Sequence, residues 1–260
     1  VSLTGSERAG RAIASQAGEA LKKCVLELGG TDAYVVLDSS DVKAAAETAW
    51  NKRIGNVGQA CTSNKRMIVM EDIYDEFVQA LVDIASSYSE GDPLNPGEGN
   101  EFYPLSSRDA AELLAQQLRL AVEDGANLHV GGEVTGKGAY ITPAVITDIP
   151  VGSDSYYEEF FGPVAEVYKV SSEEEAIKVA NDSRYGLGGA VMSEDEERAK
   201  KVAAKIDTGM IHVNIPQARG AELPFGGVKA SGLGRELGPL GMDEFVNLQR
   251  FYVAGSDSQV

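Results

Sequence analysis

Short apolar runs alternate along the chain with longer stretches in which apolar residues recur every three to four positions. The short runs predict strands, and the longer periodic stretches predict amphipathic helices. Predicted strands cover residues 1–4, 24–28, 34–37, 66–70, 128–130, 164–170, 210–215 and 245–253. Predicted helices cover residues 7–20, 41–52, 75–88 and 108–124, and two more follow the capping patterns Ser172 with Glu175 and Ser193 with Glu196. This alternation indicates an α/β fold with a largely parallel sheet and flanking helices.

The charge balance narrows the class of partner. The chain has 23 Lys and Arg against 40 Asp and Glu, which gives a net charge of −17 over 260 residues. Such a field repels phosphate backbones and anionic lipids, so we expect no nucleic-acid partner and no membrane partner. Two cysteines cannot form a disulfide framework in so long a chain, which favours a cytoplasmic compartment. No paired Cys or His spacing occurs, so no metal site is predicted.

Cys61 is the first candidate for chemistry. It ends the segment NVGQAC, and glycines at 55 and 58 allow this loop to bring a thiol close to a substrate carbonyl. Backbone N–H groups of the loop are suited to receive an oxyanion. The alternative is a small buried apolar residue, which is the commoner role of a free cysteine and the role predicted for Cys24.

Glu27 is the second candidate, as a lone carboxylate in the apolar run VLEL just before Gly29 and Gly30. Burial raises the pKa of a carboxyl group, which makes it a better base near neutral pH. The alternative is a solvated residue at the end of a strand. The segment EEFFGPV leaves two readings open in the same way, because its acid pair and aromatics suit either a cofactor site or a corner of the core.

Taken together, these segments resemble the aldehyde dehydrogenase superfamily along the whole chain. LELGG with Glu27 and NVGQAC with Cys61, 34 residues later, look like the family's general base and nucleophile. EEFFGPV, NDSRYGL and PFGGVKASGLGRE follow in the family's order. The closing stretch GRELGPLGMDEFVNLQ is most similar to bacterial succinate-semialdehyde dehydrogenases of the shorter type.

The resemblance implies a mechanism of aldehyde oxidation with NAD or NADP. Cys61 attacks the aldehyde carbon, a hydride leaves for the nicotinamide, and Glu27 activates the water that hydrolyses the thioacyl enzyme. It also implies that Glu159 holds the nicotinamide ribose and that Phe161 packs near that end of the cofactor.

Further residues follow from the same resemblance. Gly5 and Ser6 are expected near the pyrophosphate, at the N-terminus of the first helix. Phe225 is expected to line the substrate funnel. Long-form succinate-semialdehyde dehydrogenases carry an arginine just before the Asn of the nucleophile loop. Here that position is Gly55, with Arg53 two residues earlier, and Arg219 is the predicted substitute for binding a substrate carboxylate.

The domain organisation is also read from the family. Residues 1–28 correspond to a remnant of a Rossmann-type cofactor domain, 29–230 to the catalytic domain, 231–245 to a helical return to the cofactor domain, and 246–260 to an oligomerisation strand and tail. The chain thus resembles the second half or so of such an enzyme. The family's first half carries an asparagine of the oxyanion hole and the residues that choose NAD or NADP.

The resemblance implies a homodimer or homotetramer that acts on a small aldehyde. Two alternatives remain open. One is a non-catalytic structural or oligomerising module of the same fold. The other is a cofactor-independent hydrolase that uses Cys61 with Glu27 or His212, although His212 lies in an apolar strand and is predicted to be structural.

Overall fold

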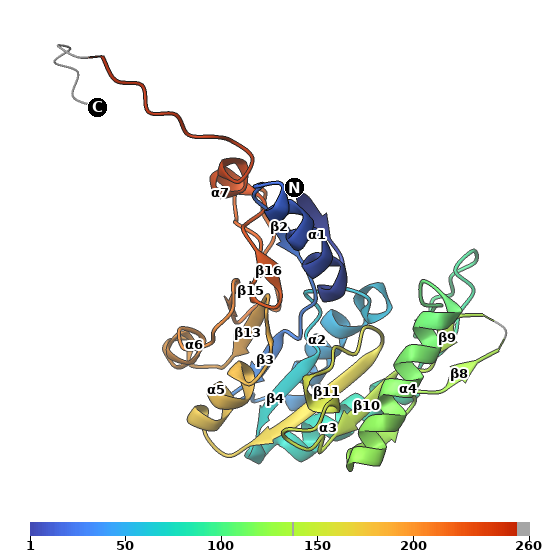
Figure 1. Cartoon of the computed structure of the whole chain (residues 1–260). Helices are drawn as coiled ribbons and strands as arrows, with labels where there is room; N and C mark the ends of the chain where they lie inside the picture. The colour runs from blue at the N-terminus through green and yellow to red at the C-terminus, as the bar shows by residue number, and fades with distance from the viewer. Residues whose placement is uncertain (137, 254–260) are drawn as a thin grey trace.

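A seven-stranded sheet organises the molecule (Figure 1). The computed structural model describes residues 1–136 and 138–253. The strand order is β14-β13-β3-β4-β11-β10-β7, and every neighbouring pair is parallel except β10 with β7. The strands are β14 His212–Val213, β13 Gly189–Met192, β3 Ala33–Val36, β4 Arg66–Met70, β11 Val164–Val170, β10 Ala144–Thr147 and β7 Asn127–Val130. The prediction of a largely parallel sheet is confirmed.

Both faces of this sheet are buried, as its central strands require. Along β3, Tyr34 and Val36 belong to one apolar cluster, whereas Ala33 and Val35 belong to the other. This alternation follows from the two-residue period of a strand. Apolar residues therefore occupy successive positions of the central strands, as is usual for a parallel sheet covered by helices on both sides.

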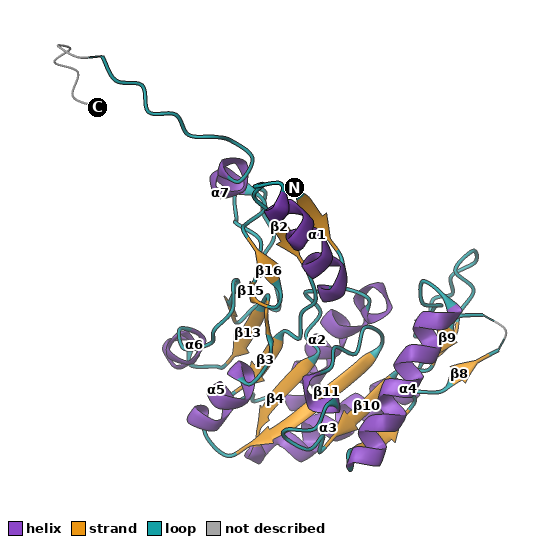
Figure 2. Ribbon diagram, in the orientation of Figure 1, coloured by secondary structure: helices purple, strands orange, loops and turns teal. Residues whose placement is uncertain are grey.

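Helices cover both faces of the sheet (Figure 2). The first cluster contains side chains of α2 Val42–Ile54 and α3 Glu71–Ser86. The second contains side chains of α4 Arg108–Asp124, α5 Glu173–Asn181 and α6 Glu196–Ala203. Within the described residues, no helix has both the length and the apolar character needed to cross a membrane.

A small three-stranded sheet holds segments from both ends of the sequence. Strand β2 Val25–Glu27 pairs in parallel with β1 Ser2–Thr4 and antiparallel with β16 Gly232–Leu233. Helix α1 Glu7–Glu19 follows β1, and α7 Gly238–Asp243 follows β16. Glu27 pairs with Thr4 on one side and with Gly232 on the other, so it lies in the middle strand.

The remaining elements are short. They are β5 Ser89–Glu90 with β6 Glu101–Phe102, β8 Val134–Thr135 with β9 Tyr140–Ile141, β12 Tyr185–Gly186 with β15 Val228–Lys229, and the 3-10 helices η1 Gly55–Gly58 and η2 Ser155–Tyr157. They lie between the main elements, and some of them, such as β12, are buried.

Some predicted elements are wrong. The strand expected over 245–253 does not form, and residues 246–253 run away from the body as an extended, exposed tail (Figure 1). A strand needs a hydrogen-bonded neighbouring strand, and residues 246–252 pair with no strand of the described part of the chain. The strand expected over 210–215 is only β14, and β10 and β13 were not predicted. Helix α6 is capped by Asp195, which accepts from two backbone N–H groups, and not by Ser193. Residues 254–260 of the expected tail lie outside the described residues.

Candidate active site

The loop before Cys61 has an unusual backbone. Within η1, Asn56 has φ and ψ of 53° and 37°, Val57 has 57° and 31°, and Gly58 has a φ of 72°. Left-handed backbone is unfavourable for a β-branched residue such as Val57 and costs on the order of 1–3 kcal/mol. The surrounding contacts must therefore hold this turn in place, and the turn fixes where the thiol lies.

Arg53 supplies much of that support. Its side chain is fully buried, and its guanidinium donates to the backbone carbonyls of Gly58 (3.1 Å), Phe160 (2.7 Å) and Val164, and to the Ser63 hydroxyl (2.7 Å). Burial lowers its pKa to about 10, so it stays charged at neutral pH. Arg53 thus ties the nucleophile loop to the EEFFGPV segment, and its buried donors are committed to protein acceptors, so it cannot serve a substrate carboxylate.

Glu27 is a buried carboxylate without a protein partner. Its side chain is only 2% exposed, and neither carboxylate oxygen has a hydrogen-bond partner among the described residues. Burial raises its pKa to about 7; the Glu236 carboxylate adds to this effect, and Arg235 opposes it. The group is therefore close to half ionised at neutral pH. Its unsatisfied oxygens suit a water molecule or another polar ligand.

Gly29 and Gly30, which follow β2 after Leu28, carry the chain past the Cys61 loop at close range. A Cβ atom on Gly29 would lie 2.4 Å from Glu159 Oε2, and one on Gly30 would lie 2.7 Å from the Cys61 carbonyl oxygen. The backbone contact at position 30 requires glycine, whereas a side chain at position 29 would displace the Glu159 carboxylate. The LELGG segment, the Cys61 loop and Glu159 thus meet at one place in the fold.

Lys65 joins the nucleophile loop to Glu159. Its side chain is fully buried, and Nζ donates to the carbonyls of Ala60 (2.8 Å) and Cys61 (3.0 Å). The same ammonium lies 3.0 Å from Glu159 Oε1, which also accepts from the Gly30 N–H at 3.0 Å. The Phe161 ring centroid is 5.5 Å from Nζ, and Phe161 is itself 44% exposed.

Opposing charges act on the Cys61 thiol. Burial raises its pKa, and the carboxylates of Asp32 and Glu159 act in the same direction. Lys65 acts in the opposite direction. Burial also raises the pKa of Asp32 to about 6, against the effect of Lys65 and of the hydrogen bond from the Gly188 N–H. The protonation of the thiol thus depends on the balance between one buried cation and its neighbouring carboxylates.

Gly5 and Ser6 open α1 beside the small sheet. The Ser6 hydroxyl caps the helix by accepting from the Ala9 N–H at 3.3 Å. The Gly5 N–H donates to the Glu27 carbonyl at 2.9 Å. The N-terminus of a 13-residue helix therefore lies directly beside the strand that carries Glu27, with the positive end of its dipole and free N–H groups available to an anion.

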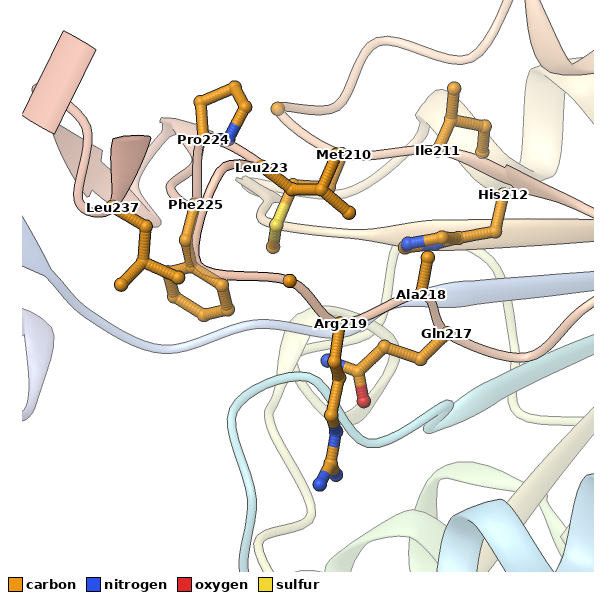
Figure 3. Close-up of a pocket in the computed structure, with 12 residues that line it drawn as sticks. Met210, Ile211, His212, Gln217, Ala218, Arg219, Leu223, Pro224, Phe225 and Leu237 are labelled. Atoms are coloured by element: carbon orange, nitrogen blue, oxygen red, sulfur yellow. The ribbon is translucent and has the colours of Figure 1, made fainter. Parts of the chain in front are cut away.

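Arg219 and Phe225 line a separate cavity of about 590 Å³, together with Met210, His212, Gln217 and other residues of the 209–225 segment (Figure 3). Neither Cys61 nor Glu27 lines this cavity. Two contacts link them to its walls. Gln217 accepts a hydrogen bond from Lys52, a cation that interacts electrostatically with Cys61 and Arg219. Gly226, which follows Phe225, lies against Glu27.

His212 contacts the backbone rather than the thiol. Its Nδ1 donates to the Gly189 carbonyl at 3.0 Å, which holds the ring beside the parallel strands β13 and β14. This bond fits a structural side chain. It gives no support to a Cys–His hydrolase, since no contact between His212 and Cys61 is present in the described part of the chain.

Several charged residues near the site were missed by sequence reasoning. They are Asp32, Lys52, Arg53 and Lys65, of which all but Lys52 are buried. The sequence gives a weak indication of two of them, because Lys65 directly precedes the apolar strand β4 and Asp32 directly precedes β3. Charges at such positions are usually read as solvated strand ends, and only the tertiary contacts reveal their burial.

The fold and these motifs define a known class of protein. The sequence pattern of the aldehyde dehydrogenase family matches residues 1–251. The chain belongs to this family.

Within this family, the chain is similar to several succinate-semialdehyde dehydrogenases. The chain is 50% identical over 248 residues to the succinate-semialdehyde dehydrogenase [NADP(+)] of Deinococcus radiodurans, which covers 95% of this chain and 52% of that protein. It is 41% identical over 250 residues to the succinate semialdehyde dehydrogenase [NAD(P)+] Sad of Escherichia coli, covering 96% and 54%. The chain therefore spans about half the length of the curated relatives it matches.

Solved structures of aldehyde dehydrogenases have the same fold as this chain. The succinic semialdehyde dehydrogenase of Streptococcus pyogenes, solved with NADP+, superposes with a TM-score of 0.91 at 47% identity and covers 97% of this chain and 55% of that one. The betaine aldehyde dehydrogenase of Staphylococcus aureus, solved with NAD+, has a TM-score of 0.88 at 34% identity, with coverage of 94% and 49%. The α/β fold expected from the resemblance is confirmed.

Proposed function

We propose that this chain carries the catalytic residues of an NAD(P)-dependent aldehyde dehydrogenase that oxidises succinic semialdehyde or a similar short aldehyde to the acid. One observation carries the proposal. Glu27, a buried carboxylate with no hydrogen-bond partner among the described residues, lies on the segment that passes directly against the loop of the candidate nucleophile, Cys61. Nucleophile and base are the two groups that a thioacyl mechanism needs.

Cys61 acts as the nucleophile in this proposal. Its thiolate attacks the aldehyde carbon and forms a thiohemiacetal, and the backbone N–H of Cys61 stabilises the oxyanion. A nicotinamide held beside Glu159 and Phe161 would supply the acceptor for the hydride that leaves the carbon of this adduct, and Cys61 would then carry a thioester. The positive charge of Lys65 lowers the pKa of the thiol and so favours the reactive thiolate, whereas burial acts in the opposite direction.

Glu27 acts as the base of the second half-reaction. Because its pKa is about 7, much of the group is ionised at neutral pH and can take a proton from water. The water attacks the thioacyl carbon, the carbon–sulfur bond breaks, and the carboxylic acid leaves as Cys61 recovers its thiol. The unpaired oxygens of Glu27 are available to hold this water.

The residues predicted to bind the cofactor fit a nicotinamide dinucleotide. Both polar contacts of Glu159 use Oε1, and Oε2 lies over Gly29, where the absence of a side chain leaves room. We assign Glu159 to the nicotinamide ribose, with Phe161 beside that end of the cofactor. Gly5 and Ser6 are assigned to the pyrophosphate, because a capped helix N-terminus favours an anion.

Arg219 and Phe225 are assigned to the substrate. Both line the 590 Å³ cavity, where Phe225 offers an apolar wall and Arg219 a positive charge for a remote carboxylate. The named activities of the relatives from Deinococcus radiodurans and Escherichia coli favour succinic semialdehyde, which carries such a carboxylate.

The proposal extends to organisation and assembly. We assign residues 1–28 and 231–245 to the cofactor side and 29–230 to the catalytic side of the molecule. We further propose that the tail from residue 246 pairs with another subunit in a homodimer or homotetramer. Leu248, Phe251 and Tyr252 of this tail are 95%, 86% and 79% exposed, which is costly for apolar side chains without a partner.

The direct test is the formation of reduced nicotinamide from succinic semialdehyde, followed by near-ultraviolet absorbance with NAD and NADP in turn. Turnover that is lost in Cys61→Ala supports the proposal. Glu27→Gln is expected to form the thioacyl enzyme and to release it slowly, so mass spectrometry should find succinyl bound to Cys61. Absence of that adduct counts against the role of Glu27, and a failure to bind either cofactor favours a non-catalytic module.

A further inference from the structure

The contacts of Lys65 carry an inference beyond the roles already assigned. An ammonium group has three N–H donors. Here they meet three oxygens, those of the Ala60 and Cys61 carbonyls and of the Glu159 carboxylate, at 2.8, 3.0 and 3.0 Å. Two partners belong to the nucleophile loop and the third belongs to the candidate ribose ligand. The side chain is fully buried, so water does not compete for these donors.

We propose that Lys65 is a positioning residue that couples Glu159 to the Cys61 nucleophile, so that a ligand which engages Glu159 directs the charge of Lys65 onto the thiol. The proposal rests on the assignment of Glu159 to the cofactor ribose. In the resting site the carboxylate neutralises the ammonium. When a ribose hydroxyl draws the carboxylate away, two hydrogen bonds still hold Lys65 to the loop, but its charge is less compensated.

The other charged groups around the thiol do not offer this route. Asp32 accepts from the backbone N–H of Gly188 and is enclosed within the fold, so a ligand cannot readily reach it. Lys52 interacts electrostatically with Cys61, but its hydrogen bond is to Gln217, which lines the cavity of Arg219 and Phe225. The Thr62 N–H also faces the thiol and is backbone. Among the described groups that act on the thiol, only Glu159 combines a contact to Lys65 with partial exposure, at 16%.

A double-mutant cycle tests the link without any aldehyde or cofactor. The rate at which iodoacetamide alkylates Cys61 reports its thiolate, because the thiolate displaces iodide and the thiol does not. Glu159→Gln removes the neutralising charge and keeps the shape of the side chain. We expect it to raise the alkylation rate at pH 8 by about tenfold, the effect of roughly one pKa unit. Cys24→Ser in all proteins confines the reaction to Cys61.

The variant Lys65→Met separates an effect of Glu159 that acts through Lys65 from a direct effect of Glu159 on the thiol. Glu159 also repels the thiolate directly, so some acceleration is expected from its removal alone. In the Lys65→Met background the gain from Glu159→Gln should fall to about twofold or less. An equal gain in both backgrounds overturns the proposal, as does an unchanged rate in Glu159→Gln alone. Circular dichroism verifies that each variant is folded.

A second measurement tests the same proposal if the variant Lys65→Met does not fold. NADP added to the protein with Lys65 intact should shift the pH profile of alkylation to lower pH. In Glu159→Gln the profile should already be shifted and should respond little to NADP. A full NADP response in Glu159→Gln overturns the coupling. The expected double-mutant cycle without any NADP response in the parent would support the Lys65 link and overturn the ribose assignment of the proposed function.

Discussion

Gly226 lies so close to Glu27 that a Cβ atom at position 226 would stand 2.8 Å from Oε1 of the carboxylate. Its backbone also has a φ of +147°, a conformation that residues with side chains rarely adopt. The same Cβ would lie 2.9 Å from the Gly234 carbonyl oxygen. The PFGG segment and the candidate base therefore share one tightly filled space.

The first prediction concerns this space. Gly226→Ala should displace the Glu27 carboxylate and strain the backbone by about 1–3 kcal/mol. We expect release of the thioacyl enzyme to slow by at least about tenfold, and thermal unfolding to occur at a lower temperature. Steady-state turnover and a melting curve measure the two effects. Gly18→Ala is the matched control, because nothing lies within 4 Å of a Cβ there. Unchanged turnover in Gly226→Ala would contradict the assignment.

The second prediction concerns stability and pH. The pKa of Glu27 is raised from 4.5 to about 7, so folding favours its protonated form. Below pH 4.5 the group is protonated in both the folded and unfolded states and has no effect. Between pH 4.5 and 7 the unfolded state becomes ionised first, and stability falls as pH rises.

Glu27→Gln should therefore increase the free energy of unfolding by about 1–3 kcal/mol at pH 8 and by little at pH 4.5. Urea unfolding at the two pH values measures the difference. Glu47→Gln, on the exposed face of α2, is the control and should show no such dependence. A gain of equal size at both pH values would mean that ionisation of Glu27 is not the cause.

The third prediction concerns the brace of the nucleophile loop. Arg53→Met removes the side-chain donor of the Gly58, Phe160 and Val164 carbonyls, of which Phe160 keeps the Gly162 N–H, and a buried group left unpaired costs about 1–3 kcal/mol. We expect the free energy of unfolding to fall by at least about 3 kcal/mol. Arg119→Met, on the exposed face of α4, should change it by no more than about 0.5 kcal/mol. Similar denaturant midpoints for both variants would refute the role of Arg53.

The fourth prediction concerns substrate selection. If Arg219 binds the remote carboxylate, Arg219→Ala should raise KM for succinic semialdehyde by about 10- to 100-fold, which corresponds to about 1.5–3 kcal/mol. KM for butanal, which has no carboxylate, should change little. The comparison of the two aldehydes in one variant separates recognition from general damage. An equal loss with both would remove Arg219 from the carboxylate site.

The sequence predicted the core of the fold better than the electrostatics of the site. The apolar runs that became β3, β4 and β11 were recognisable because buried parallel strands are continuously apolar. The strands β10 and β13 were missed, since each is only four residues long and β13 begins with glycine. The tail was predicted as a strand from its apolar residues, although pairing depends on a neighbour that periodicity does not reveal.

The limit of prediction from the sequence is clearest at the candidate active site. Cys61 and Glu27 stand out as residue types in ordered motifs, and their nearness through Gly29 and Gly30 follows from the structure. Lys65 could not be identified in the same way. Its candidate role depends on contacts with three oxygens, two in the Cys61 loop and one on Glu159. These two segments are far apart in the sequence, so the local sequence does not reveal the contacts.

The position of Glu27 also sets the order in which the site can be assembled. Its strand is flanked on one side by residues 2–4 and on the other by residues 232–233. During synthesis the Cys61 loop leaves the ribosome long before the strand that closes over Glu27 exists. Such distant pairing makes this sheet a late event in folding. A chain that stopped before residue 232 would therefore carry the Cys61 thiol while the strand of the candidate base, Glu27, still lacked its second neighbour.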